Sequence, residues 1–568
     1  MTSIRVWAPN ASRVRLRTGE RTAPMSAEDN GWWSGPDLAP GTDYAFLLDS
    51  DEPLPDPASR WQAAGVHGPS RVYDQGAYPW GDAAWAGRTL DGAVLYELHV
   101  GTFTPGATLE SAIERLDHLV GLGITHVELL PVNAVNGVWN WGYDGVDWYA
   151  VHEPYGGPDA LKRFVDACHA RGLAAVLDVV YNHLGASGNY LPLFGPYLKS
   201  GRSTWGALIN LEEPAVRTFI LENALMWLRD FHLDGLRLDA VHALHDDSPT
   251  HILAELSAAV ADLAAVQHRP LTLIAESDLN DPVMITGRPA GHGMDAQWDD
   301  DVHHALHAAL TGERQGYYCD FGPLSVLAKV LTSAFLHDGT YSTFRGRVHG
   351  APVDRASTSG RRFVACLQNH DQVGNRAVGN RLAELTSAAL LRVGAVLLLT
   401  SPFTPMLWMG EEWAASTRWP FFTSHPEPEL ARATGRGRLN EFADHGWDVS
   451  QMIDPQDPAA YRRAILAWDE LAEPEHRSAL ELYRALIALR AAEPALRDSD
   501  LSAVSVDYDE DERWIVVHRG RFRVVANLSG QARTVPITTR GVRLATGPVE
   551  LAADAVTLGP ESAAVLES

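Results

Sequence analysis

The sequence predicts an α/β protein whose centre is a (β/α)8 barrel of the TIM type, with a small β domain at each end. Three observations support this fold. Short apolar runs alternate with helical segments through the middle of the 568-residue chain, as in repeated βαβ units. Both ends show the two-residue alternation of half-buried strands. No glycine-rich phosphate loop follows the central runs, so a doubly wound open sheet is the less favoured alternative.

The first domain, expected over 1–88, is a β structure. Val14 and Leu16 alternate with arginines, and a second apolar run covers 44–48, which is typical of strands. Between 53 and 91 the chain is rich in Pro, Gly and Ala and has no clear period. We therefore expect a linker that packs on a neighbouring domain.

The barrel, expected over 89–495, requires eight strands, and eight short apolar runs are present. They are 94–99, 125–130, 173–180, 235–238, 271–275, 295–298, 363–367 and 406–409. The segments between them have helical spacing: Leu161, Phe164 and Cys168 form one apolar stripe, and Pro214 opens another helix. This order of elements predicts the (β/α)8 barrel with insertions.

The last domain, expected over 496–568, returns to strand periodicity. Apolar runs at 514–518 and 521–526 lie on either side of Arg519 and Gly520. A short turn between two alternating runs predicts a β-hairpin within a C-terminal β domain.

Composition and charge narrow the class of protein. Lys and Arg number 46 and Asp and Glu 72, giving a net charge of −26, which disfavours binding to nucleic acid. The three cysteines, Cys168, Cys319 and Cys366, are far apart and imply no disulfide framework. The chain shows neither a signal peptide nor a membrane span, so we expect a cytoplasmic protein without a membrane partner.

Acidic side chains follow four of the predicted strands. Asp178, Asp239, Glu276 and Asp371 lie at or just beyond the ends of apolar runs. Active sites of (β/α)8 barrels lie at the C-terminal ends of the strands, and buried carboxylates are costly. A helix cap or a salt bridge explains one such acid, but four together indicate a catalytic site.

The environment of these acids indicates two chemical roles. Arg237 and Asp239 are two residues apart on one strand, so they point to the same face and the guanidinium can stabilise the carboxylate. Glu276 follows Leu273, Ile274 and Ala275, and dry surroundings would raise its pKa and keep it protonated. A carboxylate beside a carboxylic acid is the pair that glycoside cleavage requires.

Four segments resemble the four sequence regions of the α-amylase family, and they occur in that family's order. They are DVVYNH at 178–183, GLRLD at 235–239, Glu276 after its apolar run, and NHD at 369–371, with WGYD upstream at 141–144. The chain is thereby identified as a member of the α-amylase family of glycoside hydrolases. The resemblance implies that Asp239 is the nucleophile, Glu276 the general acid and base, and Asp371 the carboxylate that binds and distorts the sugar.

The same resemblance implies residues that bind the substrate. The residues that would bind the sugar at the cleavage point and stabilise its charge are Arg237, His183 and His370. Tyr143 would stack beneath the sugar ring, and Asp178 would fix Arg237. His242 stands where many amylases have a Lys followed by His, so we expect it among the residues around the leaving group. Its alternative is a histidine without ligand contact.

Within the family, the chain is most similar to the maltooligosyltrehalose trehalohydrolases. The VWAPNA segment at 6–11 resembles the β-sandwich module that precedes the barrel in branching, debranching and trehalose-releasing members. NHDQVGNR at 369–376 and MGEEW at 409–413 differ from the Ser-His-Asp-Glu and Gly-Asn-Glu of branching enzymes. The implied reaction is retaining hydrolysis of the α-1,4 bond beside a terminal trehalose. A branching transferase, a general α-1,4-glucan hydrolase and a non-catalytic barrel are the alternatives.

The resemblance also bears on metals, cofactors and partners. Asn182 matches a position that binds calcium in some amylases, but trehalohydrolases generally lack that ion, so we expect no required metal and no cofactor. His303 and His304 are adjacent on a predicted helix, and we interpret them as a solvated helix face. A maltooligosyltrehalose synthase is the expected pathway partner. Trp139, Trp141, Trp205 and Trp419 are candidate sugar platforms, with core packing as the alternative.

Overall fold

Eight parallel strands close into a barrel, which confirms the predicted fold class. The computed structural model describes residues 2–444 and 451–568, and the strand order is β8-β9-β12-β15-β16-β17-β20-β21 with β21 pairing to β8. The strands are Leu95–Leu98, His126–Leu129, Ala174–Val179, Gly235–Leu238, Thr272–Ala275, Ala296–Trp298, Phe363–Cys366 and Thr404–Trp408. Each contains most of one predicted apolar run.

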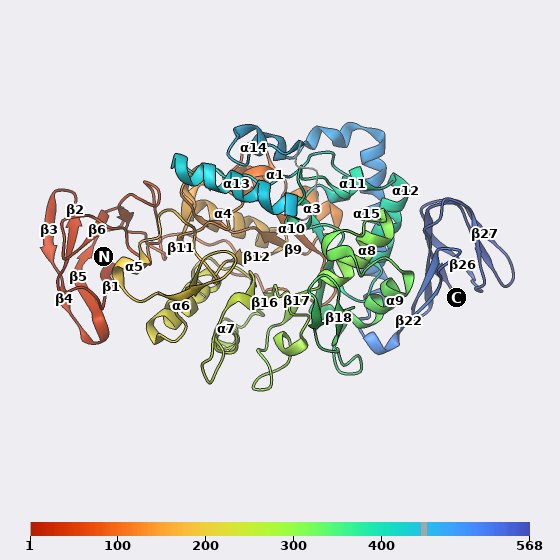
Figure 1. The fold of residues 1–568 in the computed structure, drawn as a ribbon, viewed down its shortest axis with the longest axis horizontal. Helices are drawn as coiled ribbons and strands as arrows, with labels where there is room; N and C mark the ends of the chain where they lie inside the picture. The colour runs from red at the N-terminus through yellow and green to blue at the C-terminus, as the bar shows by residue number, and fades with distance from the viewer. Residues whose placement is uncertain (1, 445–450) are drawn as a thin grey trace.

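Two β structures lie at opposite ends of the molecule, with the barrel between them (Figure 1). The N-terminal strands β1 to β7 are Thr2–Trp7, Val14–Thr18, Arg21–Pro24, Ser26–Ala27, Trp32–Leu38, Asp43–Leu48 and Ser70–Arg71, in sheets of three and four strands. The C-terminal strands β22 to β29 are Val504–Asp509, Trp514–Arg519, Phe522–Asn527, Arg533–Val535, Gly541–Ala545, Val549–Leu551, Val556–Leu558 and Ser562–Glu567. The predicted hairpin turns at Gly520, between β23 and β24.

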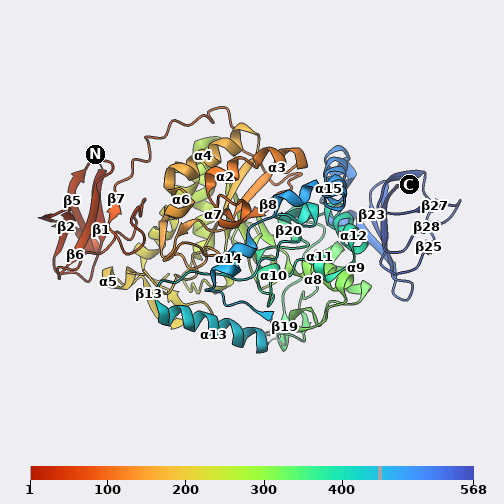
Figure 2. The same ribbon diagram turned by 90° about the horizontal axis from the view of Figure 1, so that it is seen from above.

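Helices surround the barrel (Figure 2). The longer ones are α4 (Gly157–Ala170), α6 (Pro214–Asp230), α7 (Ile252–Gln267), α8 (Asp300–Thr311), α9 (Leu324–Ser333), α12 (Ala388–Leu399), α13 (Pro428–Asp444) and α15 (Pro474–Ala492). The predicted stripe of α4 is fully buried at Leu161, Phe164 and Cys168. Burial of a Leu or Phe side chain such as the first two stabilises the fold by about 1.5–3 kcal/mol. No helix in the described residues is long and apolar enough to cross a membrane.

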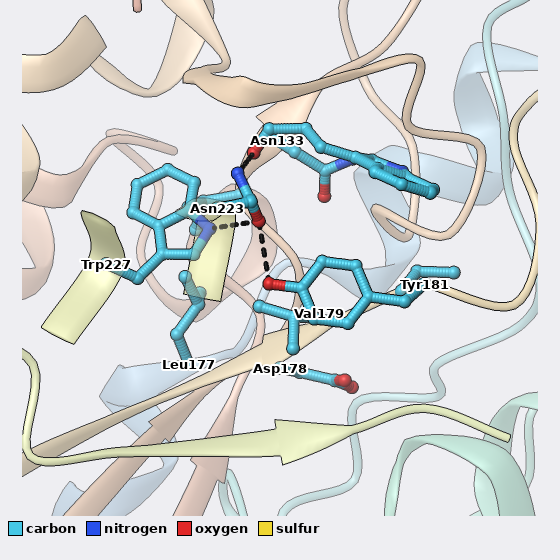
Figure 3. Close-up of a pocket in the computed structure, with 10 residues that line it drawn as sticks. Asn133, Leu177, Asp178, Val179, Tyr181, Asn223 and Trp227 are labelled. Carbon is cyan, nitrogen blue, oxygen red and sulfur yellow. Dashed lines mark hydrogen bonds between the residues drawn. The ribbon is translucent and has the colours of Figure 1, made fainter. Parts of the chain in front are cut away.

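Strand alternation decides which way the side chains of β12 point (Figure 3). Tyr181 and Trp227 both donate to the Asn223 amide oxygen, at 2.7 and 3.1 Å, behind the strand. The Asp178 carboxylate points away from this cluster, on the other face of β12. Because successive residues of a strand face opposite ways, this packing fixes Asp178 toward the barrel interior.

The linker is attached to the barrel by a buried histidine. His169 of α4 has its two ring nitrogens 2.9 Å from Asp82 of the linker and from Asp234 before β15. The Trp85 ring stacks on His169 at 4.6 Å, and its indole N–H donates to Asp234. The linker thus packs on the barrel through charged and aromatic contacts.

Candidate active site

Barrel closure brings the predicted acids to one place although they are far apart in sequence. Asp178 lies in β12, Arg237 in β15, and Asp239 and Glu276 directly follow β15 and β16. Asp371 lies in α10 (His370–Gly374), after β20. β12, β15 and β16 are adjacent in the barrel, and β20 is separated from β16 by β17 alone, so all five residues lie toward the C-terminal ends of its parallel strands.

A fully buried guanidinium connects three of the acids. Arg237 Nη1 donates to Asp178 Oδ2 at 2.8 Å and to Asp239 Oδ1 at 2.9 Å. Its Nη2 lies 3.7 Å from Glu276 Oε2, and the Trp298 ring lies 4.1 Å beneath it. A buried cation is stable only where such partners surround it. The expected contact between Arg237 and Asp239 is therefore present.

Glu276 lies where a carboxyl group holds its proton. Burial raises its pKa to about 8, and the charge of Arg237 opposes this effect. Its Oε2 accepts a 2.5 Å hydrogen bond from the amide of Ala240. Ala240 has a left-handed backbone (φ 41°, ψ 50°), which is rare for a residue with a Cβ and is found at functional sites. This turn aims the amide that follows Asp239 at Glu276.

Tyr143 joins two of the strand-end groups. Its hydroxyl donates to Asp178 Oδ2 at 2.6 Å and lies 2.8 Å from His370 Nε2. Its ring stacks on the His370 ring at 5.0 Å. The preceding Gly142 has φ 109°, and a Cβ there would lie 2.3 Å from the Pro131 carbonyl oxygen. Glycine is thus required for the turn that positions Tyr143.

His370 is a buried cation beside Asp371. Burial alone would lower its pKa, but the carboxylates of Glu97 and Asp371 raise it to about 9. Its Nδ1 lies 2.5 Å from Glu97 Oε1, and its Nε2 lies 3.7 Å from Asp371 Oδ1. The Asp371 side chain is 43% exposed and accepts from Asn375 at 3.0 Å. Asp371 is therefore open to a ligand.

Two predicted residues, His183 and His242, surround this centre together with Asn182, which was not predicted as a site residue. Asn182 donates to Asp239 Oδ2 at 2.7 Å, and the next residue, His183, donates from Nε2 to the carbonyl oxygen of Tyr143. His242 is half-buried, and its Nδ1 accepts from the amide of Asp278, two residues after Glu276. The structure therefore brings all the predicted site residues to the mouth of the barrel.

Two acids of this region were not predicted. Glu97 in β8 holds His370. Asp300 begins α8 near Asp371, and burial together with the charge of Asp371 raises the pKa of Asp300 to about 6. Asp300 follows an apolar strand, so the rule that found the other acids could have found it. Glu97 lies inside a strand, and only its position among apolar residues marks it.

The aromatic candidates fall into two groups. Trp141 and Trp419 are buried and stack on each other at 4.5 Å, so they belong to the core. Trp139, partly exposed, stacks on Tyr461. Trp205 is 49% exposed and lies edge-on to His242, at 5.8 Å between ring centres.

The interpretation of His303 and His304 as a solvated face is wrong. Both are buried, at 1% and 9% exposure, because α8 packs against the barrel on one side and α9 on the other. Within residues 2–444 and 451–568, no three His, Cys, Asp or Glu side chains are arranged to hold a metal ion.

The barrel and the carboxyl groups at its mouth define a glycoside hydrolase of the α-amylase class. The family described as "Alpha amylase, catalytic domain" matches residues 86–192, and a domain of unknown function (DUF3459) matches 499–565. The chain is 55% identical to malto-oligosyltrehalose trehalohydrolase of Arthrobacter ramosus, over 99% of this chain and 98% of the relative. It belongs to the malto-oligosyltrehalose trehalohydrolase family.

Two further comparisons agree with this assignment. The malto-oligosyltrehalose trehalohydrolase of Rhizobium sp. (strain M-11) is 52% identical over 99% of this chain and 97% of its own. A crystal structure from Salmonella typhimurium, assigned as an alpha amylase, is 37% identical. It superposes with a TM-score of 0.92 over 100% of this chain and 97% of that one. The similarity therefore covers the terminal β structures as well as the barrel.

Proposed function

We propose that this chain is a retaining glycoside hydrolase that cleaves the α-1,4-glucosidic bond next to the terminal trehalose of maltooligosyltrehalose. The products are trehalose and a shortened maltooligosaccharide. The observation that carries the proposal is full-length identity of 55% to a malto-oligosyltrehalose trehalohydrolase. The carboxyl groups gathered around Arg237 support it, because they are the groups that glycoside cleavage requires.

In the first step, Asp239 attacks the anomeric carbon and Glu276 gives its proton to the departing trehalose oxygen. The bond to trehalose breaks and a glycosyl ester forms on Asp239. Arg237 and Asn182 donate to the two Asp239 oxygens and so orient the nucleophile. The burial that raises the Glu276 pKa supports its role as the acid.

In the second step, the Glu276 carboxylate takes a proton from water. That water attacks the same carbon, and the ester bond to Asp239 breaks. Two displacements at one carbon retain its configuration, and the two carboxyl groups of a retaining enzyme stand about 5–5.5 Å apart. NMR of the freshly released maltooligosaccharide therefore checks the proposal, since the α-anomer of its new reducing end must form first.

The neighbouring residues would bind the sugars on either side. Asp371 and the cationic His370 present a charged pair to the hydroxyls of the sugar under attack, and Tyr143 and His183 adjoin them. We place His242 on the leaving-group side, because it contacts the loop after Glu276. Asp178 acts by holding Arg237 and Tyr143 in place.

Product chromatography tests the function directly. The protein is incubated with maltotriosyltrehalose and, separately, with maltopentaose. Rapid release of trehalose from the first, with the second nearly unchanged, supports the proposal. Comparable cleavage of both would make the chain a general α-1,4-glucan hydrolase. Branched product from amylose would make it a transferase.

The reaction class implies a supplier of the substrate. An enzyme that converts the reducing end of a maltooligosaccharide into trehalose must precede this one, and we propose such a synthase as its pathway partner. A cytoplasmic location remains a prediction from the sequence, which cell fractionation tests.

A further inference from the structure

Hydrogen bonds form a continuous chain from the barrel interior to the proposed nucleophile. Its members, in order, are Glu97, His370, Tyr143, Asp178, Arg237 and Asp239. The five successive distances are 2.5, 2.8, 2.6, 2.8 and 2.9 Å. The last five members are residues already placed in the site, whereas Glu97 has no role in the mechanism above.

Glu97 lies beneath the site and holds His370 at two points. Its Oε1 lies 2.5 Å from the imidazole Nδ1, and its Oε2 accepts from the His370 backbone amide at 3.0 Å. Both residues are 1% exposed. Glu97 is therefore shielded from substrate by His370, and any effect on the reaction must pass through that residue.

With Glu97 as a carboxylate, the directions of the hydrogen bonds make His370 an imidazolium. The Tyr143 hydroxyl has one proton, and it donates this proton to Asp178. The hydroxyl oxygen must then accept from His370 Nε2, while Nδ1 donates to Glu97. A neutral imidazole has only one N–H, so it would compete with Asp178 for the proton of Tyr143.

We propose that Glu97 is a positioning residue of this reaction, which holds His370 as a double hydrogen-bond donor and so fixes the chain that leads to the nucleophile. The inference rests on the proposed function and deepens it. Its physical basis is that a buried cation requires a buried anion in direct contact. Glu97 supplies that anion from a strand opposite the catalytic acids.

Several other titratable groups face His370 and set the background for its titration. They are Glu128, Asp178, Asp300, Asp371, Arg237 and His99. Arg237 disfavours the cation and Asp371 favours it. Glu97 is the carboxylate in hydrogen-bonding contact with the ring, so its removal is expected to dominate.

The test is the pH profile of the full-length Glu97→Gln variant on maltotriosyltrehalose. Loss of the carboxylate lowers the His370 pKa, so the neutral imidazole forms within the working range. We expect kcat/KM at pH 7.5 to fall about tenfold or more, and activity at pH 5.5 to return to within about threefold of wild type. An equal loss at both pH values, or no loss, would overturn the proposal.

Two further variants keep the test decisive. Glu97→Asp retains the charge and is expected to keep the wild-type shape of the profile, even if the Gln variant folds poorly. Glu128→Gln is the matched control: Glu128 is the buried partner of Glu97 across β8 and β9, and within the described residues its Oε2 has no hydrogen-bond partner. A shifted profile for either variant would count against the proposal.

The two proposals fail in different ways. If the wild-type protein released no trehalose, the proposed function would be wrong. The pH profile of Glu97→Gln would then be measured on the glucan that the wild-type protein does hydrolyse. Wild type that released trehalose, with no pH-dependent loss in Glu97→Gln, would defeat this inference alone.

Discussion

At the scale of residues, burial and shared partners give chemically similar groups different properties. Asp178, Asp239 and Glu276 all lie near one guanidinium, yet burial raises the pKa of Glu276 to about 8 and that of Asp178 to about 6. Asp178 and Asp239 each receive hydrogen bonds on both oxygens, whereas Glu276 accepts one on Oε2 from the Ala240 amide. This difference supports the acid role proposed for Glu276 and the nucleophile role proposed for Asp239.

Substitutions at Asp239 and Glu276 are expected to differ in their dependence on the leaving group. Asp239→Asn and Glu276→Gln should each reduce hydrolysis of maltotriosyltrehalose by about 10³-fold or more. An α-maltosyl fluoride loses fluoride without protonation, so Glu276→Gln should still release fluoride from it while Asp239→Asn does not. Fluoride electrode measurements check this, and equal loss in both variants would reject the assigned roles.

The alkaline side of the activity profile should report Glu276. The acid must carry its proton when the bond breaks, so kcat/KM on maltotriosyltrehalose is expected to fall as the pH rises through about 8, the value to which burial raises its pKa. With α-maltosyl fluoride the first step needs no proton, and its rate, read as fluoride release, should stay flat there. An identical decline on both substrates would assign the limb to another group.

At the scale of elements, α8 illustrates how a helix can bury polar groups. His303, His304 and His307 all lie in its buried surface, and burial lowers the pKa of each of them. Tyr318 packs against all three rings. Such neutral histidines stabilise the fold only while they remain uncharged.

We expect this helix to contribute to acid sensitivity. Burial lowers the pKa of His304 to about 4, below the unfolded value near 6.5. The unfolded chain therefore binds more protons, and stability is full above pH 6.5 and lost as the pH falls toward 4. Between pH 7 and 5 the loss is about 2 kcal/mol.

The His304→Phe variant tests this contribution. The ring stacks on Phe321 and a phenyl group does not titrate, so the variant should lose less Tm than wild type between pH 7 and 5. His518→Phe, at a partly exposed ring of the C-terminal sheet, is the control and should follow wild type. If His304→Phe lost as much as wild type, the cause would lie elsewhere.

At the scale of the whole molecule, the linker holds the N-terminal β structure to the barrel through His169. Burial alone would lower the pKa of His169, but Asp234 and Asp82 raise it above its ordinary value. The contribution of this contact to the free energy of unfolding is therefore complete below pH 6.5 and is lost as the pH rises through the folded-state pKa of His169.

His169→Gln should loosen the linker. Glutamine carries no charge and cannot bridge both carboxylates as the imidazolium does, so limited proteolysis within 53–91 should become several-fold faster at pH 7, as expected for more frequent local opening. Trehalose release should change little, because His169 is remote from the strand ends that form the site. His518→Gln serves as the control, and unchanged cleavage of His169→Gln would contradict this account.

The sequence by itself determined the elements and their chemistry. Apolar periodicity predicted all eight barrel strands, the stripe of α4 and the C-terminal hairpin, because side-chain direction follows from spacing along a strand or helix. The acids after the strands could be predicted for the same reason, since the barrel gathers its strand ends on one face.

Only the tertiary structure decided which residues meet and which are covered. His303 and His304 are buried because α8 packs between the barrel and α9. Trp141 is buried because it stacks on Trp419, which is distant in sequence. The hydrogen bonds between Glu97 and His370 form because the barrel closes by pairing β21 with β8. Spacing along the chain gives the direction of a side chain, but closure of the barrel decides what that side chain touches.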